Sequence, residues 1–255
     1  MDGVLWIALG VVLGGVLFLA RLTAQDPKDA PRHRAVWMGA DVVLLEQALM
    51  HLILEQSTRP LENRQELQEL ARHHAFDMAA RNFLADQDPE GVDHDERRRR
   101  LHPDFVGLTQ QTLASFTPDA GQSPESFARE ALAQLGTVPN KDHWSAIGLG
   151  VAIEGGRGRI CLVVGQPWAQ LSKRATWQQS TGWEVEGRTL DGTERSQLGV
   201  RLTDAQGKEC QEDASSQPGW DPDRFSLHVS VSDPSSEGCL QIERDGVPGL
   251  LRRIK

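Results

Sequence analysis

The chain has 255 residues, of which 39% are hydrophobic and 25% charged, a composition typical of a folded globular protein. Its formal net charge of −9 argues against sequence-independent binding to nucleic acid, which requires a basic face. The three cysteines are too few for a disulfide scaffold and lack zinc-ligand spacing, so no metal or other cofactor is predicted.

Residues 3–20 form an uncharged apolar run, which as a helix is about long enough to cross a bilayer. Only two residues precede the run, and Leu22-Thr23-Ala24 is a poor cleavage site. The sequence therefore favours a retained membrane anchor over residues 1–24 rather than a cleaved signal peptide. Gly10 and Gly14 form a GxxxG pair, which predicts close packing against another helix. The alternative is that glycine is simply common in membrane helices.

Helical segments dominate the first half of the remaining chain. Residues 25–34 are polar, contain two prolines and are predicted to form a linker. Apolar residues at three and four spacing predict helices over residues 35–56 and 63–83. After a turn at residues 86–93, a short charged helix is expected. A further helix over residues 123–135 has Ser123 as its cap and Pro124 at its first position.

Strands dominate the second half. Two apolar strands at residues 146–152 and 159–164 are joined by a glycine-rich turn. Beyond Trp168, short alternating runs separated by glycine, aspartate and serine turns predict a small antiparallel β-sandwich-like domain over residues 176–255. Its predicted strands cover residues 183–187, 198–203, 225–231 and 239–243, with a long loop at residues 213–223.

Three residues of this β domain are candidates for specific roles. Cys210 and Cys239 would form a disulfide in an oxidising compartment, although two unpaired thiols remain the alternative. Trp220 lies in a Pro-Gly-Trp-Asp-Pro loop and is a candidate contact residue for a partner protein.

The segment from Leu67 to Phe83, followed by Asp88-Pro-Glu-Gly91, resembles the CAP superfamily of cysteine-rich secretory proteins, antigen 5 and plant pathogenesis-related proteins. Two later segments match in the same order: Ser123-Pro-Glu at a helix start, and Ile147-Gly-Leu-Gly-Val-Ala152 before a hairpin. The resemblance spans about residues 40–170. It implies a three-layer α-β-α sandwich over residues 35–172, and hence an α+β protein.

The resemblance also implies where a functional site would lie, but the family's site residues are replaced. Asp86 stands where members usually have a histidine, and Gln110-Gln111 falls nearest to their Glu-Asn pair. No histidine lies between Pro103 and Asp142, where members usually have a second one. Glutamine does not ionise, and one aspartate cannot replace two imidazoles. The resemblance therefore implies a cleft without metal-binding or acid–base groups.

Other polar clusters have plainer interpretations. His73 and Asp77 have the i,i+4 spacing of metal ligands, but a polar helix face is favoured. The four arginines at residues 97–100 could bind phosphate or lipid headgroups. The surrounding carboxylates instead favour a solvated helix, or a patch that pairs with a partner protein. Cys161 lies in an apolar strand and is interpreted as core rather than as a nucleophile.

These observations together predict a non-enzymatic, single-pass membrane subunit that packs in a larger membrane-protein complex and makes protein–protein contacts. The alternatives are a membrane-tethered module that binds a lipid, glycan or peptide in the cleft, and a hydrolase with a rearranged site. The resemblance implies a periplasmic or extracellular location, because CAP proteins are typically exported. Basic residues after the apolar run, at positions 21, 28, 32 and 34, favour the cytoplasmic side instead. We expect the extracytoplasmic location.

Overall fold

The chain divides into two units, Met1–Arg34 and Ala35–Lys255. The computed structural model describes part of the second unit, namely residues 39–118, 121–136, 144–172, 176–178, 182–190, 193, 198–204, 213–218, 224–230, 238–245 and 247–254. Within these ranges, no helix has both the length and the apolar character needed to cross a membrane. The predicted anchor, with Gly10 and Gly14, lies outside the described residues.

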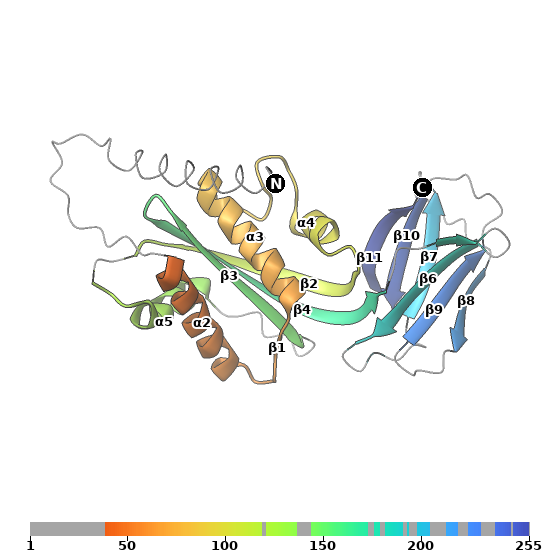
Figure 1. Cartoon of the computed structure of the whole chain (residues 1–255), viewed down its shortest axis with the longest axis horizontal. Helices are drawn as coiled ribbons and strands as arrows, with labels where there is room; N and C mark the ends of the chain where they lie inside the picture. Colours follow the sequence, from red (N-terminus) through yellow and green to blue (C-terminus); the bar gives the residue numbers. More distant parts are fainter. Residues whose placement is uncertain are drawn as a thin grey trace, which may run out of the picture. The chain divides into compact units, whose positions relative to one another are not determined.

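The described residues form an α+β fold (Figure 1). The helices are α2 (Gly39–Gln56), α3 (Gln65–Arg81), α4 (His94–Leu101) and α5 (Pro124–Leu135). The first strands are β1 (Glu62–Asn63), β2 (Phe105–Phe116), β3 (Ala146–Glu154) and β4 (Arg157–Leu171). The later strands are β5 (Thr176–Gln178), β6 (Gly182–Thr189), β7 (Leu198–Asp204), β8 (Asp213–Pro218), β9 (Arg224–Ser230), β10 (Gly238–Arg244) and β11 (Val247–Ile254).

Strand β4 links the helix-covered part of the fold to the C-terminal strands. It pairs antiparallel with β3 and β2 along most of its length, and its last three residues pair with β6. The larger sheet therefore has the order β1-β3-β4-β6-β9-β8, with β2 beside β4 and β5 beside β6. A second sheet has the order β11-β10-β7. The larger sheet thus continues past residue 172, where the sequence suggests a domain boundary.

Helices cover both faces of the β2-β3-β4 region, as Figure 1 shows. On one face, Ile160, Leu162 and Val164 of β4 pack in a core with α2 and α5. On the other face, Cys161 and Val163 pack in a core with α3. A strand buried on both faces needs apolar residues at consecutive positions, which explains the uninterrupted run from residue 160 to 164.

Two glycines of β3 allow α3 to lie directly on the sheet. A Cβ atom at Gly148 would lie 2.2 Å from the backbone of Leu67, and one at Gly150 would lie 2.3 Å from the backbone of Arg72. Both obstructing groups belong to the helix backbone and cannot rotate away. The Gly148-x-Gly150 pattern is therefore explained by close helix–sheet packing.

The C-terminal strands enclose a second apolar core. Val185 and Phe225 of the larger sheet pack with Leu240 and Ile242 of the smaller sheet. The sequence prediction was wrong in one part of this region, because residues 213–218 of the predicted long loop form strand β8, which pairs with β9. The polar sequence DASSQP concealed this strand, since it shows no apolar alternation.

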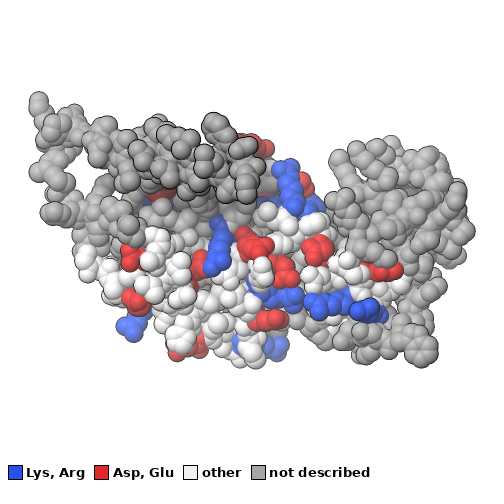
Figure 2. All heavy atoms as spheres, in the orientation of Figure 1, with Lys and Arg blue, Asp and Glu red and all other residues white. Residues whose placement is uncertain are grey.

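Several charged side chains in the described region form ion pairs. Arg81 contacts both Asp77 and Glu90, and Arg72 donates from Nε to the buried Glu46 carboxylate at 3.0 Å. Figure 2 shows acidic and basic side chains interspersed over the described part of one face. Neither positive nor negative charge predominates on the described part of that face.

Candidate functional site

An open hollow of about 760 Å³ lies where three segments meet. The loop after α3 contributes residues 85–87, the start of α4 contributes residues 93–95, and β2 contributes residues 109–111. Asp86 and Gln110, the two positions selected by the family resemblance, both line this hollow. The fold thus brings them together from segments that are 24 positions apart.

A chain of hydrogen bonds connects the polar side chains of the hollow. Gln111 donates from Nε2 to Oδ1 of Asp86 at 3.0 Å. His94 donates from Nδ1 to Oε1 of Gln111 at 3.0 Å, since an amide oxygen only accepts. Nε2 of His94 then accepts from the hydroxyl of Thr109 at 2.8 Å. Both ring nitrogens are therefore occupied.

His94 is held as a neutral imidazole. Burial lowers the pKa of His94 below the usual histidine value, and it outweighs the opposing effects of the Asp95 charge and the Gln111 hydrogen bond. No sequence pattern indicates that His94 lies in this hollow, because the resemblance points to residue 86 for an imidazole. Its position follows from the start of α4, where the Asp93 side chain accepts from the backbone N–H of Glu96 at 2.7 Å.

Two buried side chains, His74 and Arg97, donate hydrogen bonds to the loop that borders the hollow. His74 is fully buried and donates from Nε2 to the carbonyl oxygen of Ala85 at 3.0 Å. Burial lowers the pKa of His74 to about 4, so this ring is also neutral. Arg97 is 3% exposed and donates from Nη2 to the carbonyl oxygens of Asp86 and Val92, at 3.4 and 3.3 Å.

The arginine run differs from the solvated helix that the sequence favours. Arg97 and Arg98 are buried, so that interpretation is wrong for half of the run. Arg99 and Arg100 agree with it, because each donates to the Glu96 carboxylate, at 3.0 and 2.8 Å. The pattern of four identical residues could not separate the inward pair from the outward pair.

The remaining sequence candidates are not gathered at this hollow. Asp77 accepts from Arg81 Nε at 2.7 Å, while His73 is exposed. Among the described residues, no three or more histidine, cysteine, aspartate or glutamate side chains are grouped to hold a metal. Cys161 is fully buried, and burial raises the pKa of its thiol to about 12.

The candidate disulfide and contact residue fall largely outside the described region. Cys210 and Trp220 lie outside the described residues. Cys239 lies on β10, with its backbone paired to Thr203 of β7 and Arg253 of β11.

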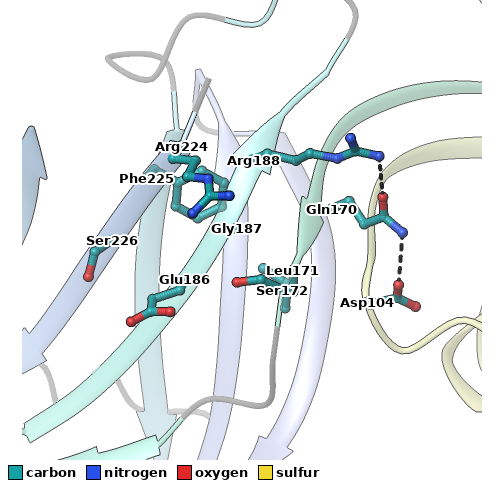
Figure 3. Close-up of a pocket in the computed structure, with 10 residues that line it drawn as sticks. All are labelled: Asp104, Gln170, Leu171, Ser172, Glu186, Gly187, Arg188, Arg224, Phe225 and Ser226. Carbon is teal, nitrogen blue, oxygen red and sulfur yellow. Dashed lines mark hydrogen bonds between the residues drawn. The ribbon is translucent and has the colours of Figure 1, made fainter. Parts of the chain in front are cut away.

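A second hollow, of about 730 Å³, lies beside the C-terminal part of the larger sheet (Figure 3). Gln170, Arg188 and Arg224 occupy directly opposed positions on β4, β6 and β9. Arg188 donates to Gln170 at 2.9 Å, and Gln170 donates to Asp104 at 3.1 Å. Sequence reasoning missed this row because three separate strands supply it, and no local motif marks it.

Comparisons with known proteins found little. No family model matches the chain, and no curated protein matches it. Among solved structures, the chain is similar to an outer surface protein from Borrelia burgdorferi. The two are 17% identical, the match covers 52% of this chain and 96% of that chain, and the TM-score is 0.34.

Proposed function

We propose that the chain is a membrane-anchored, non-enzymatic accessory subunit of a larger membrane-protein complex. In this proposal, residues 3–20 span the bilayer, and the folded unit makes protein–protein contacts on the extracytoplasmic side. The hydrogen bonds of His94 are the observation that supports the non-enzymatic part of this proposal. Its two nitrogens are engaged by Gln111 and Thr109, so the ring has no free lone pair to abstract a proton or bind a metal.

The layered architecture supports the CAP resemblance from which the proposal started. Helices lie on both faces of the antiparallel β2-β3-β4 region, and Asp86 and Gln110 line one hollow. A hydrolase with a rearranged site is less well supported. It would have to break the hydrogen bonds of His94 before that ring could act as a base.

The location can be tested through the two cysteines of the β-rich region. In an oxidising compartment we expect Cys210 and Cys239 to be linked. Mass spectrometry of protein alkylated directly in its own membrane should then find both thiols protected. Two alkylated thiols would weaken the extracytoplasmic assignment and favour the cytoplasmic side.

The membrane helix provides the test of complex formation. Tagged wild-type chain, extracted with mild detergent, should retain partner membrane proteins in fixed ratio. Gly10→Leu and Gly14→Leu place bulk on one helix face and should each reduce partner recovery about tenfold. Gly15→Leu is the matched control, because this neighbour lies about 100° around the helix. Equal recovery with all three variants would contradict a packing role for Gly10 and Gly14.

A further inference from the structure

One edge of β2 is unpaired in the described part of the fold. Among the described strands, β2 pairs with β4 alone. Beyond that ladder, no backbone hydrogen bond joins residues 107–115 to another described segment. Side chains in the middle of the strand, from residue 108 to 113, are half-buried, as expected beside an open edge.

The register of the neighbouring hairpin shows which backbone groups of β4 face β2. Strands β3 and β4 close on the pair Glu154 and Arg157 around a two-residue glycine turn. The closing residues of such a hairpin bond to each other, so Arg157 and every second residue after it bond toward β3. The amide of Val151 confirms this alternation, because it points away from β4 and donates to the Glu46 carboxylate at 3.4 Å.

The same alternation identifies the outward groups of β2. Gln110, Thr112 and Ala114 are opposite Val164, Leu162 and Ile160, which bond toward β2. The residues between them therefore turn their backbone N–H and C=O groups away from the sheet. These outward-facing residues are Thr109, Gln111, Leu113 and Ser115.

The composition of β2 lacks the usual protection of an exposed edge. Natural edge strands carry lysine, other charges or proline, which discourage pairing with further strands. Residues 105–116 read FVGLTQQTLASF and contain no charged residue and no proline. An edge of this kind is a ready template for another strand.

The hollow beside this edge is acidic. Asp86, Asp93 and Asp95 line it, and no lysine or arginine is among the described residues that do so. The Asp95 side chain is 61% exposed, and its carboxylate lies 3.6 Å from the Arg98 guanidinium. His94 is neutral and adds no positive charge to the lining. A basic side chain placed here would meet complementary charge.

We propose that an extended segment of a partner protein adds to the β2 edge as a further strand, with a lysine or arginine in the acidic hollow. The proposal rests on the proposed function, since the partner is a subunit of the same complex. A second copy of this chain fits less well, because pairing two β2 edges would bring two acidic hollows together in chains of net charge −9.

Amide hydrogen exchange tests the pairing directly. The full chain with its co-purified partners is compared with the full chain purified alone, both in the same mild detergent. In the complex, exchange at Thr109, Gln111 and Leu113 should slow by about tenfold or more, because their N–H groups gain partners. Exchange at Gln110 and Thr112, already bonded to β4, should change much less.

The outcomes separate this inference from the proposed function. If partners co-purify but the outward amides exchange equally in both preparations, the strand-addition proposal is wrong and the proposed function stands. Equal slowing of amide exchange at the outward residues and at Gln110 and Thr112 would also overturn the inference, because it indicates that the partner covers the region without pairing as a strand. If no partner co-purifies, both proposals fail.

Variants test the edge and the charge independently. Ser115→Pro removes an outward N–H from an exposed residue, while Ser115→Thr keeps it. Only the proline variant should therefore lower partner recovery, by about tenfold.

Asp86→Asn and Asp95→Asn remove charge with little change in shape and should each weaken partner recovery several-fold at low salt. Glu125→Gln, an exposed site on α5 outside the hollow lining, is the matched control. Unchanged recovery with the aspartate variants would overturn the basic-residue part.

Discussion

Arg98 of α4 donates a hydrogen bond from Nη1 to the carbonyl oxygen of Gly249 in β11, at 3.2 Å, although 151 positions separate the two residues. The same nitrogen lies 3.4 Å from the carbonyl oxygen of Phe105, where β2 begins. The guanidinium is buried, and burial lowers the pKa of Arg98. A single side chain thus connects α4, β2 and β11.

Removing this connection should destabilise the fold. Arg98→Met keeps apolar bulk but leaves two buried carbonyl oxygens without this donor, which should lower the free energy of unfolding by about 2 kcal/mol. Arg100→Met is the control, because Arg100 is 62% exposed and its surface pair with Glu96 contributes less than about 1 kcal/mol. Denaturant titration followed by circular dichroism measures both. Equal effects of the two variants would show that the buried bonds are not important for stability.

The close approach of α3 to the sheet gives a second prediction. Gly150→Ala places a methyl group 2.3 Å from the backbone of Arg72, so the helix must shift. We expect a loss of stability of about 3 kcal/mol or more. Gly39→Ala, at a site with nothing within 4 Å, should be neutral or slightly stabilising. Thermal unfolding of both variants checks this, and an unchanged Tm for Gly150→Ala would contradict the packing.

Stability should decline in mild acid because of His74. Its pKa is lowered from 6.5 to about 4, so the unfolded chain binds a proton more readily than the folded protein does. The contribution of His74 to the free energy of unfolding is therefore complete above pH 6.5. It is lost as the pH falls toward 4, which lowers that free energy by up to about 3 kcal/mol. The lowered pKa of His94 acts in the same direction.

Histidine variants separate this effect from the titration of other groups. His74→Gln should flatten the dependence of unfolding free energy on pH between 6.5 and 5. His73→Gln, at an exposed neighbouring site, is the matched control. Denaturant titrations at several pH values measure the slopes. A wild-type slope in the His74→Gln variant would show that this ring does not control acid stability.

Cys161 should be chemically inert in the folded protein. It is fully buried, and its thiol pKa is raised to about 12, so very little thiolate forms near pH 8. Alkylation by iodoacetamide at pH 8, followed by mass spectrometry, should label Cys161 only after unfolding. Rapid labelling in the native protein would contradict its place between α3 and the sheet.

Local patterns predicted most of the helical part of the fold. The predicted cap at Ser123 is confirmed, because its side chain accepts from the backbone N–H of Ser126 at 3.2 Å. The predicted hairpin is also confirmed, with Gly155 and Gly156 at positive φ in its turn. These features depend on residues that are close in the chain, so periodicity and turn chemistry reveal them.

The missed features depend on distant parts of the chain. Strand β2 was not predicted, because its centre, Thr109-Gln110-Gln111-Thr112, is polar and shows no apolar alternation. The Arg98 side chain is buried because it binds β11, and no residue near it in the sequence predicts this contact. Asp86 and Gln110, the positions to which the resemblance points, both line one hollow, whereas His94 is brought there by the start of α4 and has no signal in the sequence.

The mass of the particle that contains the chain after gentle extraction tests the central claim most directly. Native mass spectrometry from mild detergent should find the 28.2 kDa chain in an assembly with other membrane proteins at a constant ratio. A particle of the chain alone, recovered reproducibly from membranes under conditions that preserve other complexes, would contradict an accessory role.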